Sequence, residues 1–545
     1  MKRLRLLALG VGVALAILAL PLSQAGAGLT ETKRYLVVFG GSYAVDGNYA
    51  VDEQYAVDEQ YAVDEQYAVD EQYAVDDEYA VDEQYAVDEQ YAVGSCYAVD
   101  AGYAVGPEYA VGSCYAVAHD YAVGLVTLAG GTVTNDLMNQ IGVLVVESAN
   151  AAFADVMRSY AVLNGYAVVE EVAEDYVWTS PNVSGGGGPD QTNDALESQQ
   201  WSMQQIRTAE AHAIQAGWRA VDVGILDTGI DAAHPDFDDD GLVPGGSTNV
   251  DCARGHDSVP KGPSPTGVPF PCIDNGFHGT HVAGIVAAQA NVQGVTGVAP
   301  NVTLVPVKVC DQNFCYASAA VDGITYAGDA ELDVLNMSFF ADDGELLESV
   351  ECKPNSDPRL RAFAEAVNRA VRYATKRGAV SIVAAGNSDT KLDSSDDCQV
   401  VPQESPGVVD VAALGPTKQK ASYSSWGEVE VAAPGGTATG TCHNGVLSTF
   451  PMALGGYGCI SGTSMASPHA AGVAALIVSQ RGKLGSDGDV KISPDRVKDL
   501  LYATTIDQGA PGRDACFGYG RIDALRAVTG TTTRTYDTTL TSCVN

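Results

Sequence analysis

Three side chains in this 545-residue sequence stand in settings that suit acyl-transfer chemistry. A hydroxyl becomes a good nucleophile near neutral pH only if a base takes its proton, and a carboxylate must orient that base. Asp227 directly follows the apolar run 221–226, and His278 opens a helical pattern. Ser464 stands where a Ser-Gly-Thr loop turns into another helical pattern. These segments predict an orienting acid, a general base and a nucleophile.

A fourth segment predicts a donor for the negative charge that such an attack creates. Ile382-Val-Ala-Ala-Gly-Asn387 ends a strand-like run on a carboxamide. A side-chain amide, together with the backbone N–H of Ser464 at a helix N-terminus, is the kind of donor pair that stabilises an oxyanion.

The same residue types also occur in other kinds of catalytic or metal site. Asp-Thr-Gly at 227–229 also marks aspartic proteases, but those enzymes pair two such loops, and a second is absent from the sequence. His278 and His281 could suggest zinc, yet the sequence lacks His-Glu-x-x-His. We expect His281 and His469 to be packed structural residues.

An acidic segment near Gly241 could bind calcium through carboxylate oxygens. It holds Asp236 and the run 238–240, without the spacing of an EF-hand loop. A solvated acidic turn is therefore the favoured interpretation, with calcium as the alternative.

The elements that must position these residues alternate between strand-like and helical patterns from about residue 198 to 528. Such alternation predicts an α/β fold with a parallel, doubly wound sheet and helices on both faces, which binds substrates at the carboxyl ends of its strands. The expected strands are 221–226, 302–307, 334–337, 380–385 and 408–412, and the expected helices are 278–288, 318–327, 361–377, 464–479 and 494–503.

The N-terminus has the features of an export signal. Lys2, Arg3 and Arg5 precede an apolar run at 6–20, and small residues follow up to Ala27. A membrane anchor is disfavoured because the run is short for a bilayer span.

Export to an extracellular location also suits the ten cysteines from Cys252 onward, an even number that can pair in an oxidising compartment. The pairing hypothesis joins sequence neighbours, as 252–272, 310–315, 352–398, 442–459 and 516–543.

A hexapeptide repeat, Tyr-Ala-Val-x-x-x, fills residues 43–126. It contributes heavily to the formal net charge of -39, which argues against nucleic acid or anionic membrane as the main partner. Neither face of a strand built from the repeat would be cleanly apolar, and its acids would repel one another. A solvated low-complexity spacer is favoured over a stacked repeat fold.

Around the repeat, the sequence predicts a small α+β domain. Its strand-like runs are at 35–39, 141–146 and 168–172, and its helical run is at 151–159. A Gly/Pro/Ser-rich linker at 179–189 follows this domain.

The four segments that contain these predicted catalytic residues resemble the signatures of the subtilisin-like serine protease family, and they follow one another in the order Asp227, His278, Asn387, Ser464. The resemblance spans about 199–528 and implies the roles of acid, base, oxyanion donor and nucleophile for these residues. It also implies that the preceding segment is an inhibitory propeptide. Phe340 stands where the family usually has Gly, which implies a different pocket shape. The substrate-binding residues implied by the resemblance are Ser338, Ala384, Ala385 and Gly386.

The resulting hypothesis is a secreted serine endopeptidase made as an autoprocessed zymogen. Its parts are a signal peptide at 1–27, a propeptide at 28–190 interrupted by the repeat, a catalytic domain at 191–530 and a Thr-rich tail at 531–545. We expect a monomer that acts on proteins or peptides, is inhibited by its own propeptide, and in its mature form binds neither nucleic acid nor membrane. No cofactor is required, and calcium remains a candidate structural ion. The alternative is an inactive protein of the same fold that displays the repeats for binding or adhesion.

Overall fold

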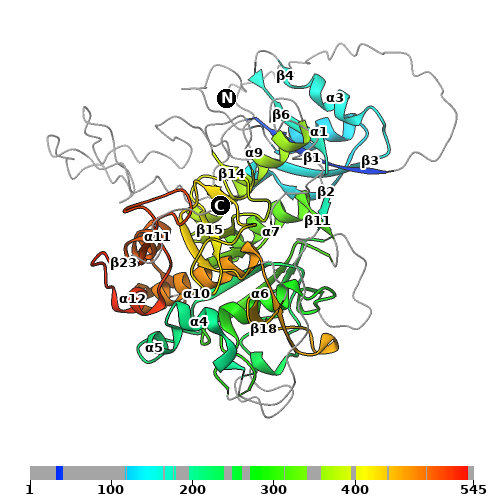
Figure 1. Ribbon diagram of the computed structural model, residues 1–545. Coiled ribbons are helices and arrows are strands. Elements are labelled where there is room, and N and C mark those ends of the chain that lie inside the picture. Colours follow the sequence, from blue (N-terminus) through cyan, green and yellow to red (C-terminus); the bar gives the residue numbers. More distant parts are fainter. Residues whose placement is uncertain are drawn as a thin grey trace, which may run out of the picture.

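The computed structural model describes residues 32–40, 117, 119–163, 166–175, 177–179, 196–238, 248–259, 270–291, 293–311, 314–339, 358–393, 400–437, 441–486 and 488–537. The predicted signal, nearly all of the repeat and the end of the tail lie outside this range. The described residues form two parts: the N-terminal module, made of those within 32–175, and the main domain, made of those within 196–537 (Figure 1).

The main domain is built on a seven-stranded sheet of order β17-β15-β13-β12-β8-β10-β9. Each neighbouring pair of strands is parallel. The central strands are short and fully buried, as expected for a sheet covered on both faces. The seven strands of the sheet are β8 (Asp222–Asp227), β9 (His256–Asp257), β10 (Thr303–Lys308), β12 (Val334–Met337), β13 (Val380–Ala384), β15 (Val409–Leu414) and β17 (Val431–Pro434).

Helices cover both faces of this sheet, which confirms the predicted doubly wound architecture. Successive strand residues such as Ile382 and Val383 belong to different hydrophobic cores, because successive side chains point to opposite faces. One core includes α6 (His278–Ala287), α10 (Thr463–Arg481) and α11 (Pro494–Ala503). The other includes α7 (Ala317–Asp329) and α9 (Pro358–Lys376). Among the described residues, no helix is long and apolar enough to cross a membrane.

Smaller elements complete the main domain. They are α4 (Trp201–Gln205), α5 (Thr208–His212), α12 (Ala524–Thr529), β11 (Phe314–Tyr316), β14 (Lys391–Leu392), β16 (Trp426–Gly427), β18 (Val446–Thr449), β19 (Tyr457–Ile460), β20 (Lys483–Leu484), β21 (Val490–Lys491), β22 (Asp507–Gln508) and β23 (Tyr536–Asp537).

The N-terminal module is a four-stranded antiparallel sheet of order β2-β3-β1-β6. One face packs on α1 (His119–Leu128) and α3 (Phe153–Ser159) in a core of its own. The other face, with Leu36 and Val145, joins the core around α7 and α9 of the main domain. The strands are β1 (Lys33–Phe39), β2 (Thr132–Leu137), β3 (Val143–Ser148) and β6 (Val169–Glu174), and the short elements are α2 (Met138–Ile141), β4 (Val162–Leu163) and β5 (Tyr166–Ala167).

Polar contacts also join the module to α7 and α9. The Asp175 carboxylate accepts hydrogen bonds from the backbone N and the Oγ of Ser318, at 2.9 and 2.6 Å, in the first turn of α7. Arg361 Nε of α9 lies 2.7 Å from Glu171 Oε1. A carboxylate is favourable at a helix N-terminus because the backbone N–H groups there lack intrahelical partners.

The spacer interpretation is wrong for the last units of the repeat. Residues 119–126 belong to α1, although the repeat was expected to run as a solvated segment to residue 126. Ala122, Leu125 and Val126 are buried, with the spacing of one face of a helix, and they pack in the core of the module. Earlier units of the repeat, up to residue 116, lie outside the described residues.

The cysteine pairing hypothesis is confirmed for three of its five bridges. Disulfides join Cys252 to Cys272, Cys310 to Cys315, and Cys442 to Cys459. Cys516 is also disulfide-bonded, and its partner lies outside the described residues, as do both members of the pair proposed at 352 and 398.

Candidate active site

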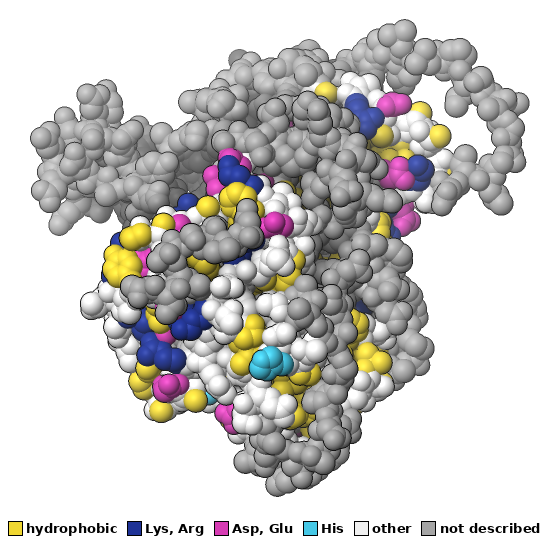
Figure 2. Space-filling model, viewed as in Figure 1, with side chains coloured by type: hydrophobic (Ala, Val, Ile, Leu, Met, Phe, Trp, Pro, Cys, Tyr) yellow, Lys and Arg dark blue, Asp and Glu magenta, His cyan; other side chains and the backbone are white. Residues whose placement is uncertain are grey.

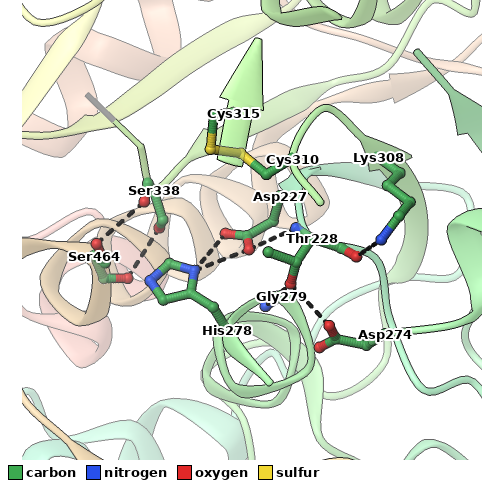
Figure 3. Close-up of a disulfide and its surroundings, with 10 residues drawn as sticks. All are labelled: Asp227, Thr228, Asp274, His278, Gly279, Lys308, Cys310, Cys315, Ser338 and Ser464. Carbon is green, nitrogen blue, oxygen red and sulfur yellow. Dashed lines mark hydrogen bonds and ion pairs between the residues drawn. A yellow bond between two sulfur atoms is a disulfide. The ribbon is translucent and has the colours of Figure 1, made fainter. Parts of the chain in front are cut away.

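The three residues predicted to act as acid, base and nucleophile meet at one edge of the sheet. Asp227 is the last residue of β8, His278 is the first residue of α6, and Ser464 lies in the first turn of α10. The carboxyl ends of parallel strands share one edge, and the helices that begin there direct their N-termini toward it. Figure 3 shows the imidazole between the carboxylate and Ser464.

Asp227 holds the imidazole through its inner nitrogen. Both carboxylate oxygens lie 2.9 Å from His278 Nδ1, and both side chains are buried. The Thr228 backbone N–H donates to Asp227 Oδ1 at 2.7 Å, which fixes the carboxylate. Because Nδ1 carries the hydrogen directed at the carboxylate, Nε2 is the nitrogen available to accept a proton.

Opposing effects act on the pKa of His278. Burial lowers it, whereas the charge of Asp227 and its hydrogen bond raise it, with a further contribution from the charge of Asp274. The net result is a pKa above the ordinary value of 6.5. An imidazole tuned in this way is a stronger base than free histidine.

A buried polar network joins the end of β8 to the start of α6. Asp274 Oδ2 accepts hydrogen bonds from the backbone N and Oγ1 of Thr280, at 2.9 and 2.7 Å. Asp274 Oδ1 accepts one from Thr228 Oγ1, which itself accepts from the Gly279 N–H. Lys308 is fully buried on β10 and donates to the Thr228 carbonyl. Sequence reasoning missed Asp274, although its position shortly before His278 placed it in the same loop.

The Ser464 hydroxyl donates to the Ser338 carbonyl at 3.1 Å, and Ser338 Oγ donates back to the Ser464 carbonyl at 2.9 Å. His278 Nε2, on the Ser464 side of the ring in Figure 3, is buried and has no hydrogen-bond partner among the described residues. The hydrogen bond from Ser464 Oγ to His278 Nε2, through which the proton would pass, is thus not formed in this structure.

Asn387 is fixed in one orientation beside the start of α10. Its Oδ1 accepts hydrogen bonds from the backbone N and the Oγ1 of Thr463, both at 2.9 Å. The Nδ2 group of the carboxamide therefore points away from Thr463. A Cβ placed on Gly462 would lie 3.4 Å from this Nδ2, so a glycine here keeps the donor uncovered.

The residues expected to bind substrate lie beside this constellation. Ala384 and Ala385 are buried at the end of β13, and the Gly386 N–H donates to Thr463 Oγ1 at 3.1 Å. Ser338 is buried as well, and its hydroxyl is already engaged by the Ser464 backbone. Phe340 lies outside the described residues.

Sequence reasoning also missed a pair of short strands. β7 (Val177–Thr179) follows the N-terminal module and pairs antiparallel with β11, with Val177 opposite Tyr316 and Thr179 opposite Phe314. Each strand has only three residues, and pairing between segments so far apart in the chain leaves no local pattern in the sequence.

The interpretation of Asp236 as part of a solvated turn is wrong. Asp236 is 0% exposed and accepts hydrogen bonds from the Val295 N–H and the Tyr457 hydroxyl, both at 2.9 Å. Burial raises its pKa to about 7. The described residues hold no group of three or more His, Cys, Asp or Glu side chains that could bind a metal ion, and Asp239 and Asp240 lie outside them.

The two other histidines near the site are packed residues, as predicted. His281 Nε2 is 3.0 Å from the Val446 carbonyl, and His469 Nδ1 is 2.7 Å from the Met465 carbonyl. Burial lowers the pKa of His281 to about 3 and that of His469 to about 4, so both rings are neutral near pH 7.

A family comparison agrees with this geometry. The model of the subtilase family, peptidase group S8, matches residues 219–520, more than half of the chain. The chain belongs to the subtilase family. It is a subtilisin-like serine protease, as the resemblance predicted.

The matched part of this subtilase covers nearly the whole length of some individual relatives. Subtilisin DY from Bacillus licheniformis is 37% identical over 309 residues, which cover 56% of this chain and 91% of that protein. Thermitase from Thermoactinomyces vulgaris is 31% identical over 336 residues, which cover 61% of this chain and 97% of that protein. A solved structure, the epidermin leader peptide processing serine protease from Staphylococcus aureus, shares the fold with a TM-score of 0.57 at 19% identity, covering 76% of this chain and 96% of that one.

Proposed function

We propose that this subtilase is an endopeptidase in which Asp227, His278 and Ser464 form the catalytic triad. The observation that carries the proposal is the paired contact of Asp227 with His278 Nδ1, which leaves Nε2 on the side of Ser464. The three groups occupy one buried strand end and two helix starts, so their positions depend on the core of the domain and not on mobile loops.

The reaction follows from these positions. Ser464 Oγ attacks the peptide carbonyl while His278 Nε2 takes its proton. The tetrahedral oxyanion accepts hydrogen bonds from Asn387 Nδ2 and the Ser464 backbone N–H. His278 then gives the proton to the leaving amine as the C–N bond breaks. Water, deprotonated by the same imidazole, then attacks the acyl carbon, and His278 returns the proton to Ser464 Oγ as the C–O bond to the serine breaks.

We assign the binding of the substrate chain to the segments around this centre. An extended peptide would add to the edge of β11 as β7 does, because a strand edge offers backbone donors and acceptors to any sequence. Ala384, Ala385 and Gly386 would form a wall of the pocket for the residue before the cut bond, with Ser338 beside it. Their small side chains leave room for a bulky group.

The rest of the chain fits a secreted precursor. Residues 1–27 would direct export, residues 28–190 would form the inhibitory propeptide with the repeat inserted, residues 191–530 would form the catalytic domain and residues 531–545 a tail. The packing of the N-terminal module on α7 and α9, and of β7 on β11, supports inhibition in cis. The precursor would cut itself within the linker after β7 and release a monomer that acts on proteins or peptides.

No organic cofactor is needed for this chemistry, and calcium is at most a structural ion. Nucleic acid and membranes are poor partners for a chain of net charge -39. On the face in Figure 2 the described Lys and Arg side chains lie among Asp and Glu side chains.

The pH dependence of peptide hydrolysis tests the proposed base. Only neutral His278 can accept a proton, and its pKa lies above 6.5, so kcat/KM should fall as the pH drops below that pKa. We expect a half-maximal value above pH 6.5, measured with a fluorogenic peptide on the mature protein. A flat profile between pH 5 and 8 would contradict the assignment, and an absence of hydrolysis at every pH would favour the inactive, repeat-displaying alternative.

A further inference from the structure

The Cys310–Cys315 disulfide has a position that the triad does not explain. It joins Cys310, just after the end of β10, to Cys315, the middle residue of β11, with 4.0 Å between the two Cα atoms. The same two residues also form an antiparallel backbone bridge. Both half-cystines are buried, at 2% and 0% exposure.

One end of this bridge is attached to the catalytic acid. The backbone N–H groups of Val309 and Cys310 both donate to the Asp227 carbonyl, at 3.0 and 3.2 Å. Figure 3 shows the disulfide beside Asp227. Because β10 also pairs with β8 along its whole length, this end is rigid without the disulfide.

The position of β11, at the Cys315 end of the bridge, depends on the disulfide far more than the position of β10 does. β11 has three residues, and β7 is the other strand of its two-stranded sheet. Without β7, the backbone pairing of β11 that remains among the described residues is the bridge between Cys310 and Cys315, and α7 begins directly after it at Ala317. A strand this short has little stability without a neighbour.

We propose that the Cys310–Cys315 disulfide is a positioning element for the substrate: it keeps β11 extended and at a fixed distance from Asp227 after β7 has gone. This inference rests on the proposed function, because it assumes that peptides dock on β11. A peptide that binds to a preformed strand edge does not have to order that edge, and the disulfide therefore contributes to affinity. The chemical step depends on the triad, which β8 and the helices hold separately.

The test is a Cys310→Ala/Cys315→Ala variant in the full chain, compared after maturation with wild type. For a peptide that extends at least four residues before the cut bond, we expect KM to rise about tenfold, with kcat within twofold. For an ester of a single amino acid, which does not reach β11, both constants should stay within twofold. A Cys252→Ala/Cys272→Ala variant is the matched control, since it removes a disulfide that does not involve β11, and its KM for the long peptide should not change.

Titration with a serine-reactive phosphonate separates a failure of the proposed function from a failure of the proposed role of the disulfide. If wild type does not react, the proposed function fails. If wild type and the variant react equally and KM for the long peptide is unchanged, only the role of the disulfide is refuted. An equal loss on both substrates would also refute it, because the disulfide would then support the fold in general. A Cys310→Ser/Cys315→Ser variant, which keeps the side-chain volume, replaces the alanine variant if that one does not fold.

Discussion

A folded Ser464→Ala precursor is expected to remain uncut however long it is incubated in isolation. The substitution removes the oxygen that forms the acyl bond, and neither His278 nor Asn387 can replace it. Wild-type precursor should release the module together with β7 and yield a new N-terminus between residues 180 and 199, within or beside the linker. Gel electrophoresis with time and N-terminal sequencing of the product measure both outcomes.

The control for this experiment is a serine near the other end of the same helix. Ser479 Oγ donates to the Ala475 carbonyl within α10, and Ser479→Ala should mature at the normal rate. Circular dichroism must show that both precursors are folded, because a misfolded precursor would also fail to mature. Normal maturation of folded Ser464→Ala in isolation would rule out self-processing by this nucleophile.

Asn387→Ala should mature and hydrolyse peptides slowly but measurably. Nucleophile and base remain, while one of two donors to the oxyanion is lost, which costs on the order of 10²–10³ in kcat, or about 2.7–4 kcal/mol. The oxyanion exists only in the transition state and the tetrahedral intermediate, so KM should change much less than kcat. Steady-state kinetics on the mature variant, processed if necessary by added wild-type enzyme, provide the comparison.

The side chain of Asn387 has a second contact that the control must address. Its Oδ1 accepts from Thr463, so the substitution also removes a partner of the first residue of α10. Asn387→Asp keeps that acceptor but loses the donating NH₂, and should be as slow as Asn387→Ala. Asn301→Ala, at an exposed asparagine, should behave like wild type. A kcat within threefold of wild type for Asn387→Asp would exclude the oxyanion role.

The sheet and its helices were predictable because burial on both faces leaves a strong mark on the sequence. Strands such as 334–337 and helices such as 494–503 are observed at the predicted residues. β17 was missed because Val431-Ala-Ala-Pro is short and rich in alanine, so its place depends on pairing with β15. β7 and β11 were missed for the same reason, since each exists through the other.

The parts of the site that escaped prediction are set by tertiary contacts. The sequence placed Asp227, His278 and Ser464 at strand ends and helix starts, but the present hydrogen bond of Ser464 Oγ to Ser338 depends on a side-chain torsion. Asp236 stands among acidic residues in the sequence, yet it is buried because Val295 and Tyr457 from distant segments supply its hydrogen bonds. The last repeat units contain the same Tyr-Ala-Val as the others and are helical because a core is present to receive them.

The most direct test of the proposed triad is the position at which a peptidyl phosphonate reacts with the mature enzyme. Phosphonates of this type form a stable bond only with a serine that a neighbouring base activates. Mass spectrometry of proteolytic fragments should find a single adduct on Ser464, loss of peptide hydrolysis in proportion to labelling, and no adduct on a folded His278→Ala variant. An adduct on any other residue, or hydrolysis that persists in fully labelled enzyme, would contradict the triad of Asp227, His278 and Ser464.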